Sequence, residues 1–327
     1  MQLRELELSL ENAQLNFTLQ QLNIEKNVTT SFYSVYQSQK DLQIARDEVE
    51  NQRKNAEIIS RKAEAGLVPR EEQYQAEVNL AMAEATFNNR QIAFKDAKDR
   101  FKLLIGMALD RDFVLLPNIE ILPVLVDVEE AVRHGLELRT EIRQQQITVE
   151  KNMFTLVRTK SDNEFHGSLS ARVGLDALAG KVKNMYDNPT DNEQIGVTLS
   201  IPIFDWGAKR ARVKSTELGI EATELNFEEE RKTIILDIRQ VCHRLPVLLN
   251  QVEIQRKGVE NAERTYNIQL EKYRNGNLSG MELQQYQNQL TQAKRSYTDA
   301  IISYKLELLN LKIQTLWDFE NNCPFVK

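Results

Sequence analysis

The chain has 327 residues, of which only 12 are glycine and 7 are proline, while 28% are charged. So few chain-breaking residues indicate long helices rather than several ordinary globular domains. The formal net charge of -6 gives no reason to expect a basic face that binds nucleic acid. No stretch of about 18 consecutive apolar residues occurs, so the sequence predicts no transmembrane helix.

The sequence contains no recognisable catalytic or ligand-binding motif. Cys242 and Cys323 lie far apart, outside any metal-ligand spacing. His134, His166 and His243 are equally scattered, and no glycine-rich phosphate loop is present. We therefore expect neither an enzyme nor a protein with a cofactor, a metal or a nucleic acid partner.

Residues 1–107 are expected to form an antiparallel helical hairpin. Its turn, EAGLVPREE, places Gly66 where a left-handed helix cap is favoured and Pro69 near the start of the returning helix. Apolar residues recur mostly at alternating three- and four-residue steps, which is the seam of a coiled coil. The seam residues are Val28, Phe32, Val35, Leu42, Ala45, Val49, Ala56, Ile59 and Ala63.

A shift of 210 residues aligns the first part of the chain with the last. It superposes the words LNF and VEN on second copies of themselves, and it pairs Gly66 with Gly276 and Glu72 with Glu282. One ungapped register over roughly a hundred residues indicates a duplication. Residues 205–318 are therefore expected to form a second hairpin, followed by a tail at 319–327. Pro246 lies inside its first helix and predicts a kink or a local opening.

Between the hairpins, residues 108–127 read as an irregular connector that contains Pro117 and Pro123. Asp127 is a good N-cap for a helix that continues to about Lys160, within a segment 128–164. Residues 165–204 carry the strong β signal, in which apolar and small polar residues alternate. The apolar positions are Leu169, Ala171, Val173 and Leu175, then Ile195, Val197, Leu199, Ile201 and Ile203.

The apolar face of such a hairpin has two interpretations. In a soluble protein it would cover a core. No other strands are available to form one here, and an isolated hairpin is marginal in water. The alternative is that the apolar face meets lipid or partner chains while the polar face lines a water-filled lumen.

Two motifs stand out: IPIFDWGAKRARV, where the β-hairpin ends and a long helix begins, and AGLVPREEQYQAEVNL at the first turn. Both resemble the TolC-type outer-membrane efflux protein family. The resemblance extends over essentially the whole chain. It implies a mainly α fold with a small β part: two long antiparallel coiled-coil hairpins in tandem repeat, plus a β-hairpin contributing to a trimeric membrane β-barrel.

The resemblance also implies a function, partners and a location. The chain would be the outer-membrane exit duct of a tripartite efflux or type I secretion system, a passive conduit driven by a partner pump. Its partners would be two further copies in a homotrimer, a periplasmic adaptor (a membrane fusion protein), an inner-membrane pump and outer-membrane lipid. Most of the chain would lie in the periplasm of a Gram-negative bacterium.

The residues of interest follow from this resemblance. Expected contacts at the periplasmic tip, with the adaptor or within a gate, are Gly66, Arg70, Glu71, Glu72, Gly276 and Glu282. The junction between barrel and tunnel is expected at Pro202, Phe204, Asp205, Trp206 and Gly207. The carboxylates can equally be ordinary residues of a helix start, and the aromatic rings can pack at a strand–helix corner. Arg172 either lines the lumen or pairs with a carboxylate of a neighbouring chain.

The sequence departs from the family pattern in several places. The family turn usually carries Asp where this chain has Glu72 and Glu282, and Gly280 stands where the first turn has Arg70. The repeat register would place a first copy of the strand-to-helix junction before Met1, so we expect the sequence to be an N-terminally truncated member.

Two other functions compete with the exit duct. A periplasmic adaptor also uses a coiled-coil hairpin, but it would need a lipoyl-like β domain beside a single hairpin. A soluble coiled-coil scaffold would give the alternating strands no purpose.

Overall fold

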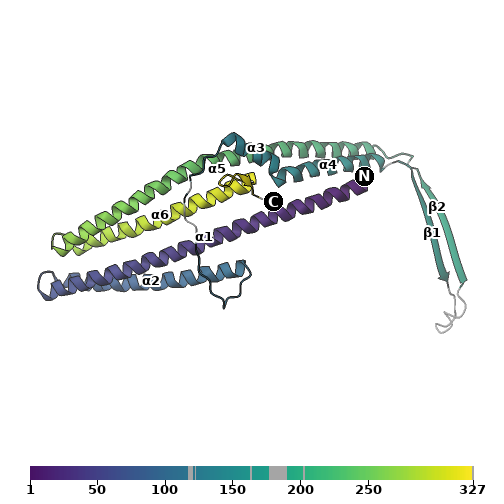
Figure 1. Cartoon of the computed structure of the whole chain (residues 1–327). Helices are drawn as coiled ribbons and strands as arrows, with labels where there is room; N and C mark the ends of the chain where they lie inside the picture. The colour runs from purple at the N-terminus through teal and green to yellow at the C-terminus, as the bar shows by residue number, and fades with distance from the viewer. Residues whose placement is uncertain (117–120, 122, 163, 177–189, 202, 326–327) are drawn as a thin grey trace, which may run out of the picture. The chain divides into compact units, whose positions relative to one another are not determined.

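A computed structural model describes residues 1–116, 121, 123–162, 164–176, 190–201 and 203–325 (Figure 1). They divide into two units that are described separately: a strand-bearing unit of residues 1–12 and 143–230, and a helical unit of residues 13–142 and 231–327. None of the helices in the described ranges is long and apolar enough to cross a membrane. The elements are α1 Gln2–Glu64, α2 Arg70–Leu104, α3 Val128–Leu138, α4 Thr140–Ser161, β1 His166–Asp176, β2 Thr190–Ser200, α5 Ala208–Arg274, α6 Gly280–Thr315, β3 Trp317–Asp318 and β4 Cys323–Pro324.

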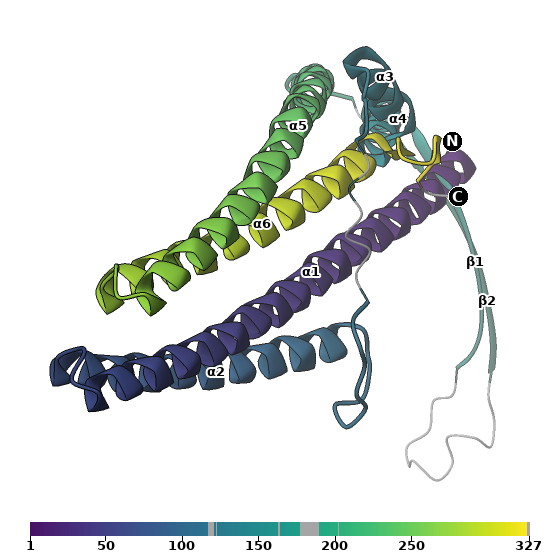
Figure 2. The ribbon, with the colours of Figure 1, turned by 60° about the vertical axis from the view of Figure 1, so that its left-hand side comes forward.

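The helical unit contains both hairpins that the duplication predicts. Helix α1 returns as α2, and α5 returns as α6 (Figure 2). Ion pairs join α1 to α2 at Asp41–Arg90 (3.1 Å) and at Arg53–Glu84 (3.2 Å). The predicted fold class, mainly α with long antiparallel helix pairs and a β-hairpin, is confirmed.

Apolar side chains from both hairpins meet in shared clusters of the helical unit. Every predicted seam residue of α1 is buried or half-buried. The cluster next to the turns consists of Ile59, Ala76, Tyr266, Tyr273, Leu283 and Leu290. A second cluster consists of Val35, Tyr36, Phe101, Leu115 and Ile302. Because each cluster draws on both hairpins, α1 buries more than the single face that a two-helix coiled coil needs.

Residues 128–160 form two helices, whereas the sequence predicts one. Asp127 caps α3 as expected, accepting a hydrogen bond of 2.9 Å from the N–H of Glu129. Helix α3 ends before Arg139, whose backbone is extended (φ -66°, ψ 127°). An ideal Cβ on Gly135 would lie 2.2 Å from Ile238 Cδ1 of α5 and 3.3 Å from the backbone oxygen of Gln314 in α6, so this face of α3 packs against the Ile238 side chain and the α6 backbone. No proline or glycine marks the break, which shows tertiary packing overriding local helix propensity.

Helix α5 continues through Pro246. The proline ring is exposed while the preceding Leu245 is buried, so the missing N–H lies away from the core. In the first hairpin the matching Tyr36 is 3% exposed. The two repeats therefore differ in what they bury at this position, with a tyrosine in the first and no proline ring in the second. The proline also removes one backbone hydrogen bond from α5.

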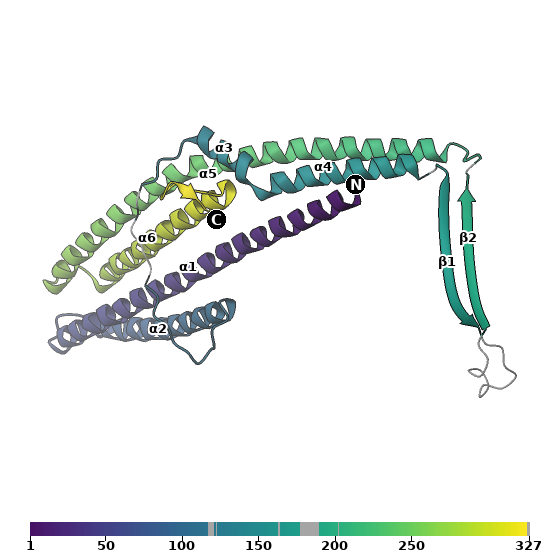
Figure 3. The ribbon, with the colours of Figure 1, turned by 45° about the vertical axis from the view of Figure 1, so that its right-hand side comes forward.

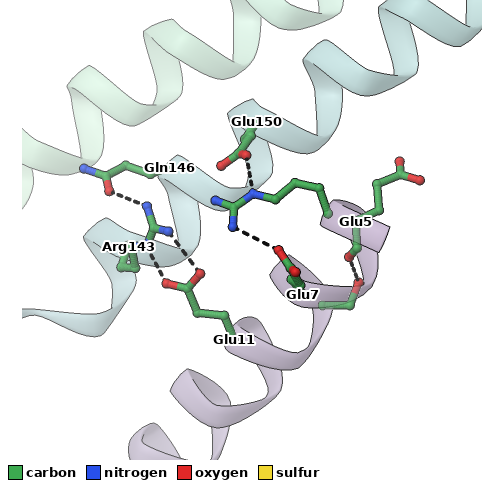
Figure 4. Close-up of polar contacts among 8 residues, drawn as sticks. Glu5, Glu7, Glu11, Arg143, Gln146 and Glu150 are labelled. Atoms are coloured by element: carbon green, nitrogen blue, oxygen red, sulfur yellow. Dashed lines mark hydrogen bonds and ion pairs between the residues drawn. The ribbon is translucent and has the colours of Figure 1, made fainter. Parts of the chain in front are cut away.

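In the strand-bearing unit the start of α1 lies against α4 through a ladder of ion pairs (Figure 4). The guanidinium of Arg143 donates to both carboxylate oxygens of Glu11, at 2.6 and 3.0 Å. About two turns away, Arg4 donates to Glu150 at 3.0 Å. Leu8, on the same stretch of α1, is fully buried.

The β-hairpin follows α4 and leads into α5 (Figure 3). Strands β1 and β2 are antiparallel, with Leu169 opposite Val197 and Ala171 opposite Ile195. Directly opposite residues share a face, so the predicted apolar face exists. Towards the loop it ends, because Val173 lies opposite Glu193.

The last residues of the helical unit fold back instead of forming a plain tail. The short strands β3 and β4 pair with each other. The Trp317 indole stacks on the His134 imidazole of α3, with ring centres 4.3 Å apart. Lys312 of α6 forms an ion pair of 3.0 Å with Asp318.

Candidate functional site: the hairpin turns and the strand-to-helix junction

The two hairpin turns of the helical unit have the same backbone conformation and hydrogen-bond pattern. Gly66 and Gly276 adopt left-handed conformations, with φ of 70° and 80°, as the sequence predicts. The N–H of Gly66 donates to Ala63 O at 3.0 Å, and the N–H of Gly276 donates to Tyr273 O at 3.0 Å. In each turn the next residue donates back one position further, at 2.8 and 2.9 Å. Both helices therefore end in the same Schellman cap, which preserves the duplication in three dimensions.

The helices that follow the turns are capped differently. Helix α2 has Pro69 at its N-cap, without a side-chain cap. Helix α6 has a full capping box, in which Glu282 N–H donates to Ser279 Oγ at 3.2 Å and Ser279 N–H donates to Glu282 Oε2 at 2.9 Å. The hydrogen bond from Ser279 N–H, followed by one of 2.8 Å from the Ser279 hydroxyl to Glu282 Oε2, lowers the pKa of Glu282. The Glu282 carboxylate thus caps the start of its own helix, whereas the matching Glu72 is not part of a capping box.

Tertiary packing brings the two turns together. Lys62, in the last turn of α1, donates a hydrogen bond of 2.7 Å to the carbonyl oxygen of Tyr273 and lies 4.6 Å from the centre of its ring. An ideal Cβ on Gly280 would be 3.7 Å from Glu72 Oε2, an ordinary contact. A cavity of about 630 Å³ lies between the turns and is lined by Lys62, Glu72, Tyr273 and Glu282 among others.

Tyr273 is the most enclosed side chain at this site. It is 1% exposed, and its hydroxyl has no hydrogen-bond partner within the part of the chain that the structure describes. Burial, and secondarily the charge of Glu72, raise the pKa of Tyr273 to about 12. A buried hydroxyl without a partner destabilises the closed arrangement that holds it.

Amide side chains join the hairpins further from the turns, about three helical turns before Lys62 in α1 and about one turn into α6. Gln52 donates to Gln284 Oε1 at 2.6 Å, and Gln52 is only 4% exposed. The sequence prediction missed this pair together with Lys62 and Tyr273. A signal existed for Gln52, because it occupies the seam position between Val49 and Ala56, where a polar residue is unusual.

The other predicted tip residues have simpler surroundings. Arg70 and Glu71 are exposed at the start of α2, and neither forms an ion pair with another residue in the described ranges. Glu71 borders a groove that also contains Gln52 and Gln284. The structure therefore brings Glu72 onto the second turn and leaves Arg70 accessible to a partner.

At the junction in the strand-bearing unit, Asp205 organises the start of α5. Its carboxylate accepts hydrogen bonds from the N–H of Lys209 at 2.7 Å and of Gly207 at 3.1 Å. These two bonds, in that order, lower the pKa of Asp205. Trp206 and Gly207 are left-handed, with φ of 53° and 82°. The backbone requirement explains the glycine, as the sequence indicates.

The aromatic residues of the junction are exposed. Phe204 is 71% and Trp206 is 90% exposed, and their rings contact each other edge-to-face at 4.8 Å. Packing into a corner therefore does not account for the indole. Arg172 is exposed on the polar strand face, opposite Gln194. Pro202, also predicted here, lies outside the described residues.

Comparison with known proteins places these features in a class. Residues 165–312 match the model of the outer membrane efflux protein family. No curated protein matches the sequence. The fold is similar to that of the Campylobacter jejuni CmeC outer membrane channel, with a TM-score of 0.76 and 16% identity over 99% of this chain and 68% of that one. VceC from Vibrio cholerae gives a TM-score of 0.71 and 15% identity over 94% of this chain and 73% of that one. The open state of the Neisseria gonorrhoeae MtrE channel gives a TM-score of 0.71 and 14% identity over 96% of this chain and 71% of that one.

The fold is thus that of an outer-membrane channel subunit. Residues 165–312 match the outer membrane efflux protein family, and the fold of the chain is similar to that of solved outer-membrane channels. The resemblance seen in the sequence is confirmed. Members of this family are outer-membrane transport channels and not enzymes, which agrees with the location and the non-enzymatic role expected from the sequence.

Proposed function

We propose that the protein is the exit duct of a tripartite efflux or type I secretion system. Three copies would share a membrane barrel, to which each contributes its β-hairpin, and a helical tunnel across the periplasm. The apolar face around Leu169 and Val197 supports contact with lipid, because both side chains are 75% exposed or more. Arg172, on the opposite face, would line the lumen.

The tunnel entrance would lie at the two hairpin turns and open when one hairpin moves against the other. The observation that carries this proposal is the pairing of Lys62 with Tyr273, which joins the end of α1 to the end of α5. The buried amide pair Gln52–Gln284 adds a second link between the hairpins. Both links are polar, but the hairpins also share the apolar cluster next to the turns. We therefore expect the gate to open by a shift of one hairpin along the other rather than by full separation.

An adaptor protein and an inner-membrane pump would supply docking and energy. The accessible Arg70 and Glu71 at the start of α2 are the side chains we assign to adaptor contact. Gly66 and Gly276 shape the turns, and Glu282 holds α6 in place, so substitution of these three would act through turn geometry rather than through lost contacts.

The test is a reversible lock across the hairpins of the full-length protein in planar lipid bilayers. Cys323→Ser removes the exposed thiol, and Gln52→Cys with Gln284→Cys introduces a pair for a short bis-thiosulfonate, which releases sulfinate and joins the two thiols through disulfide bonds that a reductant cleaves. In a background with the Lys62→Met substitution, we expect raised conductance that the crosslink abolishes and a reductant restores. The single Gln52→Cys variant treated with the same reagent is the control.

Two results would count against the proposal in different ways. Equal conductance with and without the crosslink would remove the gate from the turns. Absence of any conductance from membrane-reconstituted protein, in all variants, would contradict the duct itself.

A further inference from the structure

We propose that the protein binds the phosphate headgroups of anionic phospholipids at the junction where α4 ends and α5 begins, an inference that rests on the proposed membrane function. The site is a cavity of about 820 Å³ in the strand-bearing unit. Four basic side chains, here called the basic collar, line it: Lys160, Lys209, Arg210 and Lys214.

The charge of the basic collar is only partly balanced. Lys160 lies 3.6 Å from Glu217, and Lys209 lies 3.9 Å from Glu164, both of them loose ion pairs. Arg210 and Lys214 are exposed and have no carboxylate within 4.0 Å among the residues that the structure describes. The lining also includes Asp205, but its carboxylate already accepts two backbone N–H groups.

The position of this charge is unfavourable for the helix by itself. The collar residues Lys209, Arg210 and Lys214, together with Arg212, all lie in the first two turns of α5, and the first turn has no acidic residue. The N-terminus of a helix carries partial positive charge, which disfavours cations there. A whole chain with a net charge of -6 thus concentrates basic residues where folding alone would select against them. An anionic ligand would relieve both the repulsion among these basic side chains and their unfavourable interaction with the helix N-terminus.

The surroundings favour a lipid phosphate over a free one. Phe165 (73% exposed), Phe204 and Trp206 lie between the apolar strand face and the basic collar, along both connections of the hairpin. Ile203, also part of the cavity lining, is 96% exposed. Apolar, then aromatic, then basic is the order in which a protein meets acyl chains, the interface and headgroups. Basic clusters beside a membrane segment are attracted to anionic lipid by the negative surface potential of the leaflet.

The test measures lipid binding by the full chain in a neutral detergent. Short-chain phosphatidylglycerol is the anionic probe, phosphatidylcholine with the same chains is the neutral one, and inorganic phosphate is the free anion. The variant is Lys209→Gln/Arg210→Gln/Lys214→Gln. The matched control is Lys257→Gln/Arg264→Gln/Lys272→Gln, which removes the same charge from exposed positions further along α5.

We expect the collar variant to bind phosphatidylglycerol at least about tenfold more weakly than the wild type, since three charges are removed. The control variant should stay within about twofold, phosphatidylcholine should not distinguish the proteins, and inorganic phosphate should not compete at equal concentration. Circular dichroism and the melting temperature without lipid verify that both variants fold.

Equal weakening in the collar and control variants would overturn the site, because it would reduce the effect to net charge. Competition by inorganic phosphate at equal concentration would overturn the lipid as its ligand. Flotation with phosphatidylcholine vesicles separates this proposal from the duct: the collar variant should still float, whereas a wild type that does not float would contradict the membrane function.

Discussion

The ammonium group of Lys62 donates a 2.7 Å hydrogen bond to the carbonyl oxygen of Tyr273, which also accepts from Gly276 N–H. One carbonyl thus closes the Schellman cap of the second turn and receives the side chain of the first. Because carbonyls at the end of a helix carry partial negative charge, a lysine is the suitable donor. The two copies of the duplicated hairpin are joined at this atom.

Lys62→Met is expected to lower the free energy of unfolding by about 1–2 kcal/mol, because it removes a charge-assisted hydrogen bond and keeps the aliphatic stem. Urea denaturation measures the change. Spin labels at the exposed positions Leu67 and Met281 should show a longer or broader distance between the turns. The control is Arg61→Met, since Arg61 forms its ion pair within its own helix, with Glu57. An unchanged label distance would show that Lys62 does not hold the turns together.

Tyr273 is expected to titrate near pH 12, when its absorbance at 295 nm is isolated by subtracting a Tyr273→Phe protein. Its folded pKa lies above the ordinary value of 10, so the folded state holds this proton more tightly than the unfolded state. The resulting contribution to the free energy of unfolding is complete below pH 10 and is lost as the pH rises towards 12. Glu72→Gln should lower the pKa of Tyr273, because the charge of Glu72 helps to raise it. An ordinary pKa near 10 would contradict the burial of this hydroxyl.

Tyr273→Phe itself is expected to raise the free energy of unfolding at neutral pH by about 1 kcal/mol, because it removes a buried hydroxyl that lacks a partner in the described structure. Thermal and urea unfolding both report the change. Destabilisation would mean that the hydroxyl makes a hydrogen bond in solution.

Gly135→Ala is expected to destabilise the helical unit by about 1–3 kcal/mol, because the new Cβ would lie 2.2 Å from Ile238 Cδ1 and 3.3 Å from Gln314 O. Adding Ile238→Val removes the closer atom and should recover part of the loss in a double-mutant cycle. Gly219→Ala, with open space around its Cβ, is the control and should stabilise α5 by about 0.5–1 kcal/mol. Equal effects at both glycines would contradict the close packing of α3.

Ser279→Ala is expected to cost about 1 kcal/mol through loss of the N-cap of α6. The pKa of Glu282 is lowered by its bonds to Ser279, so the contribution of the carboxylate is present above its ordinary value of 4.5 and disappears as the pH falls below its folded pKa. The difference in melting temperature between Ser279→Ala and wild type should therefore shrink in acid. A difference that is constant from pH 6 to pH 3 would exclude the capping box.

Replacing Arg143 or Glu11 by alanine should weaken the hold of α4 on the start of α1, and the coupling between the two changes should fade at 1 M salt. The pair is partly exposed, and exposed ion pairs are screened. Amide hydrogen exchange in residues 2–12 reports the effect. Arg256→Ala, which breaks ion pairs within a single helix, is the control.

Local sequence patterns were sufficient for the long hairpin helices, their turns and strands β1 and β2. Each of these patterns involves only a few neighbouring residues. They are the three- and four-residue spacing of apolar side chains, the glycines at 66 and 276, and the alternation in residues 195–199. Their physical causes, helical periodicity, left-handed caps and pleating, are local as well. The prediction of a single helix over 128–160 was wrong, because the close contact at Gly135 is made by side-chain and backbone atoms of other helices, which no local pattern encodes.

The sequence by itself determined the duplication, the hairpins, the alternating strands and the resemblance to a channel family. Only the tertiary structure decided which polar residues meet: Lys62 with the carbonyl of Tyr273, Gln52 with Gln284, and Lys160 with Glu217 beside the exposed aromatic pair. Partners separated by 57 to more than 200 positions leave no periodic trace, because a single side chain meets them only after the helices have packed.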